Sequence, residues 1–496
     1  MGPSLHLKRL KTTFLAVITT IVLAVAILLK LTVPWLVPDE HLLPHRAMWP
    51  IHLLLATVLS CATAAAICLL GRPRPVYLVD YACFRPSSTS RVPKASVLEH
   101  ARLSPFLDDS TVNFVQRILE LPGLGDETCI PPSLCYLQPY CSLDEARAEM
   151  ELVVFSAIDD LMTKARIGNL DMIGALILNC SVFSPTPALA DMVVNRYGLR
   201  DDIRVVNLSG MGCSAGLISV GLARDLLQVM PRGAHVLVVT TEATVPLFYK
   251  GNRRSMQLTN LLFRMGGVAA LLSTSRAKAR FRLAHLGRTT TAGDDSAFRC
   301  VFMEEDDEGN RGVTLSRDLM DIAGVALKAN IAAIGPLVLP VSEQLKFVLT
   351  AVANKVAFRL LGRKARPPYV PNFCKAFEHF CIHPGGPAVI SSVEHGLNLP
   401  EKHTEASHMT FHRFGNQSSS SLWYVLAYIE AKGRMRKNER VWMIGFGAGY
   451  KCNTAVWVCI QPPPCTDGPW ASCIHRYPVD ITGGTKRAMV TNSKTT

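Results

Sequence analysis

The sequence predicts an α/β catalytic domain that follows two membrane-spanning helices. Short, uninterrupted apolar runs at 172–181 and 234–243 are typical of strands that are buried on both faces of a sheet. Helix-like patterns separate these runs, which favours alternating strands and helices. Two long uncharged segments precede the first strand, and the 496-residue chain is 49% hydrophobic and only 18% charged. These three observations define the expected fold class.

The membrane anchor is expected within residues 1–72. An uncharged run from Thr12 to Leu29 predicts a first span over about 12–33, and a second run predicts a span over about 47–70. Each can cross ~30 Å of hydrocarbon at a rise of about 1.5 Å per residue. Lys and Arg flank the pair on its outer sides, so both ends are expected in the cytosol. The alternative for the first run is a cleaved signal peptide.

The elements of the catalytic domain follow in order from Pro75. PVYLVDYACF is typical of a strand, and the segment beginning at Ser142 predicts a helix because a capping serine precedes acidic residues and helically spaced apolar ones. After the run at 172–181, RVVNL predicts another strand, and a helix is expected from Cys213. Further buried strands are predicted in GVAALLSTS and in RVWMIGFGAGYKCNTAVWVCI, with a loop at TTTAGDDSAF.

The segment 345–361 allows two interpretations. Apolar residues recur in it at helical spacing, and Lys and Arg accompany them. The first interpretation is an amphipathic helix on a membrane surface, and the second is a core helix with a solvated basic face. The apolar positions are Leu345, Val348, Leu349, Val352, Val356 and Leu360.

Charge and cysteine content narrow the partners and the compartment. The net charge is +13, but Lys and Arg are dispersed and no aromatic residues interleave them, which argues against a nucleic-acid partner. A basic surface suits anionic membrane lipid and phosphate-bearing substrates. The 15 cysteines show no metal-binding spacing and suit a reducing compartment, so no metal is expected.

One thiol stands among small residues in VVNLSGMGCSAGLISVG, residues 205–221. A strand, a tight turn and a helix pattern place Cys213 at a helix N-terminus, where exposed N–H groups and the helix dipole favour the thiolate. Gly210 and Gly212 permit the sharp turn. Cys213 is therefore a candidate covalent acyl carrier, and the alternative is a buried structural cysteine.

Two glycine-flanked histidine clusters lie further along the chain. EHFCIHPGGPAV contains His379 and His383, and HRFGNQSSSSLW contains His412 and Asn416. A lone histidine is more often a satisfied core residue, but two such clusters separated by a helix-length segment favour a shared site. His and Asn can together donate hydrogen bonds to one oxyanion, so a Cys–His–Asn set indicates acyl hydrolysis or carbon–carbon bond formation from a thioester.

These motifs, together with FSPTPALADMVVN, NLLFRMGG and GFGAGYKCNTAVW, resemble plant 3-ketoacyl-CoA synthases from about Pro75 to Pro478. Those enzymes are the membrane-bound condensing enzymes of very-long-chain fatty acid elongation. The resemblance implies a thiolase-like fold of two related βαβαβ-rich halves, 73–285 and 286–478, in five α/β layers, with a polar tail at 479–496. It implies the catalytic candidates Cys213 as nucleophile, His383 and Asn416 as decarboxylation partners, and His379 and His412 as further histidines of the pattern.

The resemblance also implies the reaction and its setting. Cys213 takes an acyl group from a long-chain acyl-CoA, and decarboxylated malonyl-CoA extends it, giving 3-oxoacyl-CoA, CoA and carbon dioxide without a cofactor. The glycines Gly445, Gly447 and Gly449 are expected to line an oxyanion hole or to form a plain strand-end turn. The 345–361 helix is expected to roof the entrance for the acyl chain at the membrane.

The same resemblance predicts where the protein works and with what. We expect an endoplasmic reticulum protein with a cytosolic catalytic domain, forming a homodimer and serving wax and cuticle lipid synthesis. Its expected partners are membrane lipid and the elongase enzymes ketoacyl reductase, dehydratase and enoyl reductase.

Two departures from the family pattern keep alternatives open. Thr290 stands where the family usually has histidine, and HPGGPA, residues 383–388, replaces the more usual HAGGRA. The proline form resembles soluble type III polyketide synthases. One alternative is therefore an anchored enzyme of that kind, and the other is a non-catalytic partner in an elongase complex.

Overall fold

The computed structural model describes residues 57, 59–63, 73–168, 170–361, 369–462 and 467–481. The chain divides into two compact units, Met1–Arg74 and Pro75–Thr496. The predicted spans at 12–33 and 47–70 lie outside the described residues, except for 57 and 59–63, which are helical. Within the described part of the chain, one helix is long and apolar enough to cross a membrane, α10 (Leu319–Val338), and it packs against the sheet.

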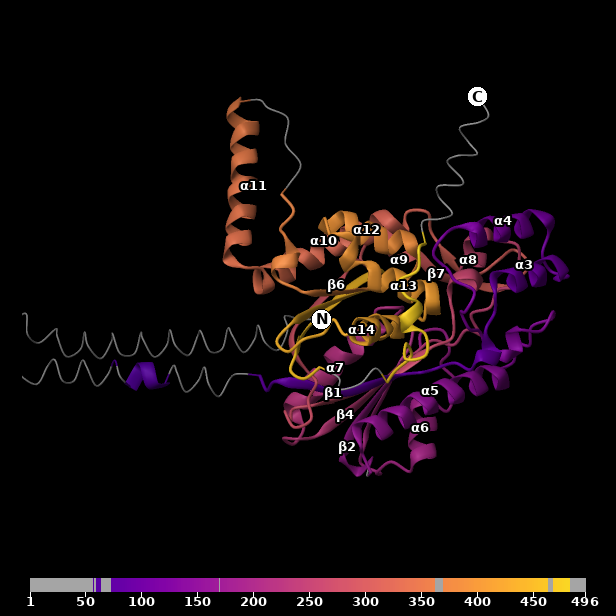
Figure 1. The fold of residues 1–496 in the computed structure, drawn as a ribbon, viewed down its shortest axis with the longest axis horizontal. Coiled ribbons are helices and arrows are strands. Elements are labelled where there is room, and N and C mark those ends of the chain that lie inside the picture. Colours follow the sequence, from indigo (N-terminus) through magenta and orange to yellow (C-terminus); the bar gives the residue numbers. More distant parts are fainter. Residues whose placement is uncertain are drawn as a thin grey trace, which may run out of the picture. The chain divides into compact units, whose positions relative to one another are not determined.

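A mixed sheet of nine strands forms the centre of the second unit (Figure 1). The strand order is β3-β2-β4-β5-β1-β6-β11-β10-β9. β2 is parallel to β3 and β4, β9 is parallel to β10, and the other pairings are antiparallel. The strands are β1 (Val76–Cys83), β2 (Ile173–Asn179), β3 (Arg204–Leu208), β4 (His235–Thr241), β5 (Gly267–Ser273), β6 (Phe281–Thr290), β9 (His379–Ile382), β10 (Arg440–Gly447) and β11 (Lys451–Cys459), with a separate hairpin of β7 (Val301–Glu305) and β8 (Arg311–Leu315).

The apolar runs predicted as strands do form them. Every residue of β1 and β5 is buried, as is nearly all of β2 and β4, because helices cover both faces of these strands. The sequence analysis did not predict β6. Arg282 and Arg288 are exposed on it and interrupt the apolar pattern, although β6 joins β1 to β11 in the sheet.

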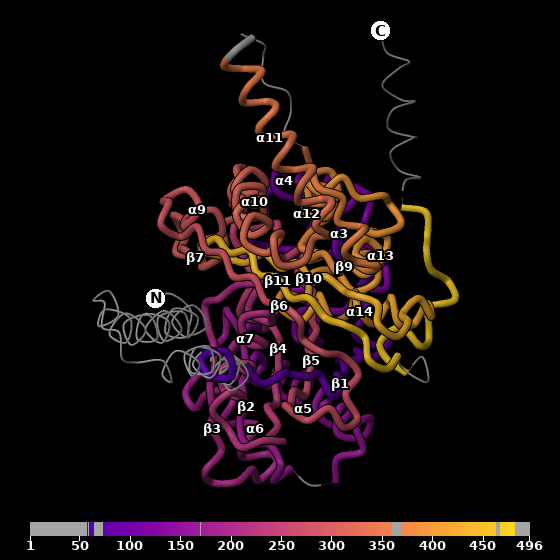
Figure 2. Tube along the Cα trace, turned by 90° about the vertical axis from the view of Figure 1, so that its left-hand side faces the viewer, coloured from indigo at the N-terminus to yellow at the C-terminus, as the bar shows by residue number. Residues whose placement is uncertain are grey.

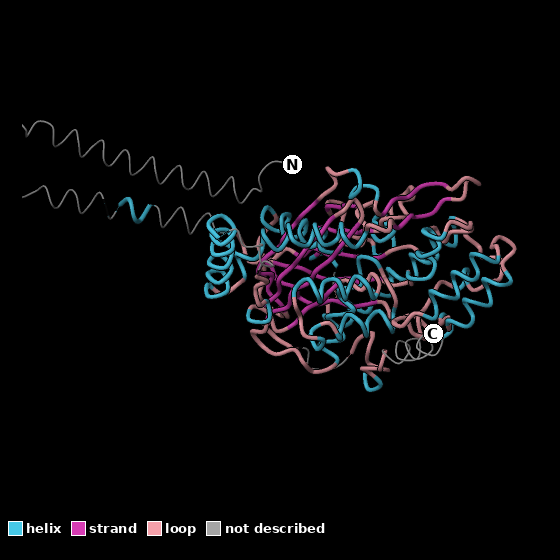
Figure 3. Tube along the Cα trace, turned by 90° about the horizontal axis from the view of Figure 1, so that it is seen from above, coloured by secondary structure: helices cyan, strands magenta, loops and turns pink. Residues whose placement is uncertain are grey.

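Helices lie on both faces of each half of the sheet, as Figure 3 shows in cyan around the magenta strands. α5 and α6 pack on the outer face of β2, β4 and β5, α7 and α14 pack between the two halves, and α10 and α12 cover β9, β10 and β11 (Figure 2). The predicted cap of α5 is confirmed, since the Ser142 side chain accepts from the Glu145 amide. The helices are α3 (Lys94–Leu103), α4 (Asp109–Glu120), α5 (Leu143–Ala165), α6 (Leu189–Tyr197), α7 (Ala215–Val229), α8 (Arg254–Leu262), α9 (Asp295–Arg299), α10, α11 (Val341–Leu361), α12 (Pro387–Leu397), α13 (Glu405–Phe414) and α14 (Ser421–Ala431).

A buried ion network fixes the junction where β1 meets β6. Arg280 pairs with Asp80 of β1 at 2.5 Å and with Glu430 of α14. The Tyr81 hydroxyl donates to the other oxygen of Glu430 at 2.6 Å. Such a network specifies its geometry because each buried charge needs its partners. It therefore ties α14 to the strand at the centre of the sheet.

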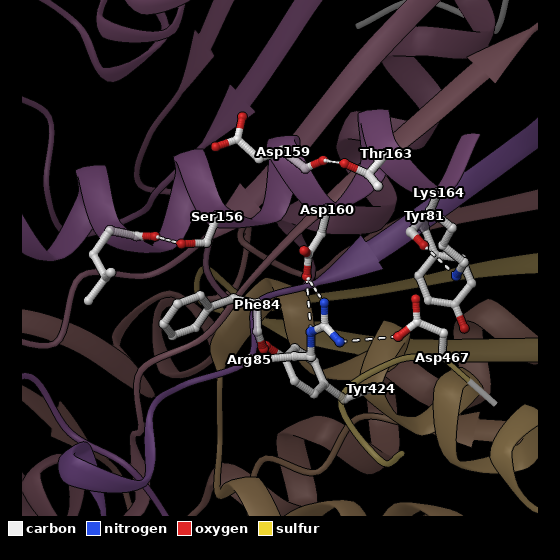
Figure 4. Close-up of polar contacts among 11 residues, drawn as sticks. Tyr81, Phe84, Arg85, Ser156, Asp159, Asp160, Thr163, Lys164, Tyr424 and Asp467 are labelled. Atoms are coloured by element: carbon white, nitrogen blue, oxygen red, sulfur yellow. Dashed lines mark hydrogen bonds and ion pairs between the residues drawn. The ribbon is translucent and has the colours of Figure 1, made fainter. Parts of the chain in front are cut away.

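Further polar contacts attach α5 to the same strand (Figure 4). Lys164 donates to the backbone carbonyl of Tyr81 at 3.0 Å. Arg85, just beyond β1, contacts Asp160 of α5 at 2.8 Å and Asp467 near the C-terminus at 3.1 Å. The outer helix and the C-terminal segment thus meet at the end of β1.

The core-helix interpretation of 345–361 is wrong. α11 projects from the rest of the unit (Figure 1), and its apolar side chains stay exposed, with Leu349 at 66% and Val352 at 55%. The segment is a helix, as predicted, but not a buried one.

Candidate active site

β3 and α7 present Cys213 on a glycine turn. Gly210 and Gly212 have φ values of 65° and 70°, in the left-handed region that favours glycine. A Cβ at Gly212 would also stand 2.3 Å from the amide nitrogen of Ala448, so this position has no room for a side chain. Cys213 is half-buried and lies two residues before Ala215, where α7 begins. The predicted turn is confirmed, and the helix starts two residues later than predicted.

Burial acts against ionisation of the Cys213 thiol. Burial raises its pKa to about 12; a hydrogen bond with the Ser418 hydroxyl opposes the shift, and the charge of Glu242 adds to it. This burial opposes the stabilisation of the thiolate that the helix N-terminus is expected to give. Another group must take the proton when the thiol reacts.

His383 offers a neutral imidazole with an unused nitrogen. Its backbone amide donates to the Ile444 carbonyl at 2.9 Å, which fixes the residue between β9 and β10. The side chain is 3% exposed, and its Nδ1 has no hydrogen-bond partner. Burial lowers the pKa of the ring to about 4, so His383 is neutral near pH 7. A neutral ring with a free nitrogen can take one proton and donate another.

Asn416 is held by its backbone and its side chain together. Its amide donates to the Leu262 carbonyl and its carbonyl accepts from the Arg264 amide, both at 2.9 Å. The side-chain oxygen accepts from the Ser418 amide at 2.8 Å, and the side-chain nitrogen donates to the Gly385 carbonyl at 3.3 Å. These bonds fix which end of the amide is the donor.

Ser418 and Gly385 connect the three candidate residues. Ser418 donates through its amide to Asn416, and its hydroxyl lies near enough to the Cys213 thiol to lower the thiol pKa. Gly385 accepts from Asn416, and a Cβ there would come within 3.1 Å of the His383 ring. Ser418 has a left-handed φ of 52°, which costs energy for a residue other than glycine. The structure thus brings Cys213, His383 and Asn416 into one cluster.

Sequence analysis missed Glu242, which lies behind this cluster. The side chain is 3% exposed, and one oxygen accepts from the backbone amides of Ser181 at 2.9 Å and Val182 at 2.8 Å. The other oxygen accepts from the Ser418 hydroxyl at 3.0 Å. Ser181 in turn accepts from the Gly212 amide at 3.0 Å. Glu242 therefore joins the turn before Cys213 to the loop that carries Asn416.

A signal for Glu242 was present in the sequence. The acidic residue directly follows strand β4, and burial raises its pKa. A carboxyl group at the end of a buried strand needs donors nearby, and this requirement marks it as a site candidate.

The three predicted loop glycines differ in position. A Cβ at Gly447 would stand 2.6 Å from the Ser214 hydroxyl, so the end of β10 touches the nucleophile turn. Gly445 lies within β10 against Leu217, and Gly449 forms the β10–β11 turn with a φ of 91°. Only Gly447 of the three contacts the turn that carries the thiol.

His379 and His412 lie outside the cluster. His379 begins β9, at the opposite end of that strand from His383, and its Nε2 is 2.8 Å from a Glu439 carboxylate oxygen. The His412 ring contacts the Tyr477 hydroxyl at 3.2 Å, and its carbonyl accepts from Gly125. Neither of these contact sets includes Cys213, His383 or Asn416.

The family histidine replaced by Thr290 would also stand apart from the cluster. Thr290 is exposed at the end of β6, where it pairs with Lys451 in the sheet. Its hydroxyl accepts from the Ala292 amide at 3.4 Å. The substitution therefore leaves the described contacts of the thiol unchanged.

An apolar pocket lies beside the Asn416 loop. It has a volume of about 110 Å³ and opens to solvent, and α3, α4, α8 and residues 130–139 contribute to its walls. Phe263, whose backbone pairs with Asn416, also lines it. No described residue of α11 lines this pocket.

Solved structures define the class of this fold. The C-terminal type III polyketide synthase domain of Steely1 from Dictyostelium matches with a TM-score of 0.60 at 17% identity, covering 78% of this chain and 100% of that one. The fungal type III polyketide synthase ORAS matches with a TM-score of 0.59 at 18% identity, covering 77% and 99%. At this identity the likeness shows the fold alone, which is the thiolase-like fold of type III polyketide synthases.

Sequence relatives are more specific. The family described as FAE1/Type III polyketide synthase-like protein matches residues 68–356, and the C-terminal domain of chalcone and stilbene synthases matches 369–460. Arabidopsis thaliana 3-ketoacyl-CoA synthase 6 is 53% identical over 84% of this chain and 83% of its own length, and 3-ketoacyl-CoA synthase 5 is 52% identical over 84% of both. The chain belongs to the 3-ketoacyl-CoA synthase family and is an acyl-condensing enzyme of the acyltransferase class. The resemblance noted in its motifs is confirmed.

Proposed function

We propose that this chain is the condensing enzyme of very-long-chain fatty acid elongation and that Cys213 carries the growing acyl group. The observation that supports this most is the continuous set of contacts from Cys213 through Ser418, Asn416 and Gly385 to His383. It combines a nucleophile, a neutral acid–base group and an amide donor in a family of condensing enzymes.

In the first half-reaction, the thiol of Cys213 attacks the thioester carbonyl of a long-chain acyl-CoA. His383 takes the thiol proton on a ring nitrogen and returns it to the departing CoA sulfur. The backbone amides of Cys213 and Ala448 are the proposed donors to the tetrahedral oxyanion, because Ala448 packs against Gly212 on the same turn. The product is an acyl-enzyme and free CoA.

In the second half-reaction, malonyl-CoA loses carbon dioxide and leaves an enolate. The neutral His383 ring and the side-chain nitrogen of Asn416 donate to the enolate oxygen, each contributing about 10²–10³-fold in rate. The enolate carbon attacks the Cys213 thioester, and the sulfur leaves as a thiolate that takes one proton from solvent. The 3-oxoacyl-CoA is two carbons longer, and no metal or organic cofactor takes part.

The apolar pocket beside Asn416 suits the acyl tail. Leaving such a chain in water costs about 0.8 kcal/mol per methylene, and the walls include Val115 and Leu261. We therefore place the tail between α3, α4 and α8.

The same proposal includes the setting. Residues 1–72 anchor the enzyme in the endoplasmic reticulum membrane through two spans, the catalytic halves 73–285 and 286–478 form five layers in the cytosol, and the product enters wax and cuticle lipids. We also propose that the enzyme forms a homodimer through β3, which is an edge strand of the sheet. It contacts the other elongase enzymes as well.

A microsomal assay tests the function. Labelled malonyl-CoA is supplied with acyl-CoA primers of increasing length, and we expect two-carbon-extended 3-oxoacyl-CoA. A polyketide product would favour the type III polyketide synthase alternative. No product with any primer, from well-expressed protein, would favour the non-catalytic partner.

A further inference from the structure

α11 exposes an apolar surface that no other described helix or strand covers. Figures 1 and 2 both show it projecting from the catalytic unit. Its large apolar side chains are between 45% and 70% exposed, which is unusual for so many on one helix. They are Val341, Leu345, Phe347, Val348, Leu349, Val352, Val356 and Phe358.

The exposed side chains do not form a single narrow seam. Leu345, Leu349, Val352 and Val356 share one face by their spacing. Phe347 and Phe358 lie on the opposite side by the same spacing. A helix that docks in a protein groove covers one face, whereas a helix immersed in a lipid interface can bury side chains on several faces.

The charge of this segment has one sign. Lys346, Lys355 and Arg359 are exposed on α11, and the sequence from Gln344 to Phe377 contains no Asp or Glu. Long cationic side chains can keep their apolar stems in lipid and their charged ends at the headgroups. A cationic segment is attracted to anionic lipid. Because this segment has no acidic side chains, none of its own charges weakens that attraction.

The N-terminal end of α11 is held by polar contacts, although the rest of the helix is exposed. Glu343 is buried, and its carboxylate contacts Lys375 at 2.7 Å, Lys346 at 3.8 Å, the Tyr369 hydroxyl at 2.6 Å and the Asn372 amide at 3.0 Å. Glu343, the single acidic residue of α11, is therefore paired with cations at the start of the helix. The projecting part is left apolar and cationic.

We propose that α11 inserts into the headgroup region of an anionic bilayer leaflet, as a membrane contact of the catalytic unit separate from residues 1–72. The partner is the lipid itself rather than a protein, because apolar side chains on both sides and uniform positive charge suit an anionic interface.

Photocrosslinking in the full-length protein tests this contact. The benzophenone amino acid p-benzoylphenylalanine replaces Leu349 in protein reconstituted in nanodiscs of phosphatidylcholine and phosphatidylserine. Leu121 is the matched control, since it is 57% exposed and follows α4, at the other end of the unit in Figure 1. Mass spectrometry then counts lipid adducts, and unchanged condensation activity shows that both variants fold.

We expect at least several-fold more lipid adducts at 349 than at 121. Replacing Lys346, Lys355 and Arg359 together by Gln should reduce the adducts at 349 several-fold when phosphatidylserine is present. Equal adduct yields at the two positions, or protein–protein adducts alone at 349, would overturn the proposal, and the second result would indicate a protein partner.

Discussion

Replacing Glu242 by Gln should make Cys213 more acidic and more reactive. The carboxylate accepts from the Ser418 hydroxyl at 3.0 Å, and both Ser418 and the charge of Glu242 act on the thiol pKa. With the Ser418 hydroxyl between them, the charge lies roughly 6 Å from the sulfur. At an effective dielectric constant of about 20, this repulsion of the thiolate is about 3 kcal/mol, or about two pKa units.

Gln keeps the shape and still accepts from the amides of Ser181 and Val182. The change should therefore cost only about 1–2 kcal/mol of unfolding free energy, because charge-assisted hydrogen bonds become neutral ones. The pKa of Cys213 should fall from about 12 towards about 10, which raises the thiolate fraction at pH 9 by up to about a hundredfold.

The assay is the rate of iodoacetamide labelling at pH 9, followed on the peptide that contains Cys213. Thermal unfolding of the same samples shows that Glu242→Gln remains folded. Labelling of a folded variant at or below the wild-type rate would refute the argument, because removal of the negative charge would then have failed to favour the thiolate.

The remaining predictions concern the histidines and Thr290. Because burial holds the pKa of His383 at about 4, the rate of condensation should not fall between pH 7 and about 5.5 through protonation of this ring. A fall in rate near pH 6.5 that is absent in His383→Gln would contradict this. His379→Ala and His412→Ala should each lose about 1–3 kcal/mol of unfolding free energy but keep turnover within about threefold. A loss of two orders of magnitude in the folded variant would put that ring in the reaction. Thr290→His should change turnover by less than about threefold, since the exposed side chain does not reach the thiol. A larger gain would show that a histidine at this position contributes to the reaction.

Local patterns predicted most of the sheet. β2, β4 and β5 came from continuous apolar runs, and the turn before Cys213 came from Gly210 and Gly212, because these features depend on burial and backbone freedom alone. β6 could not be found this way, since its two exposed arginines interrupt the apolar signal. Its place was decided by pairing with strands distant in the sequence.

Site residues were predicted only where a reactive side chain stands in a recognisable motif. Cys213, His383 and Asn416 were named from their motifs, whereas Glu242 and Ser418 act through contacts between β4 and a distant loop. The effect of burial on the thiol pKa was missed for the same reason. The helix position is visible in the sequence, but the burial that raises the pKa comes from tertiary packing.

The most direct test of the account is to trap the acyl group on the enzyme. Purified protein is incubated with a long-chain acyl-CoA alone, quenched in acid and digested, and the peptide containing Cys213 is weighed by mass spectrometry. We predict a mass increase of one acyl group on that peptide in the wild type. The adduct should disappear on adding malonyl-CoA but persist in Asn416→Ala, whose acylation is intact. An active enzyme with no adduct on Cys213, or with the acyl group on another residue, would contradict the central claim.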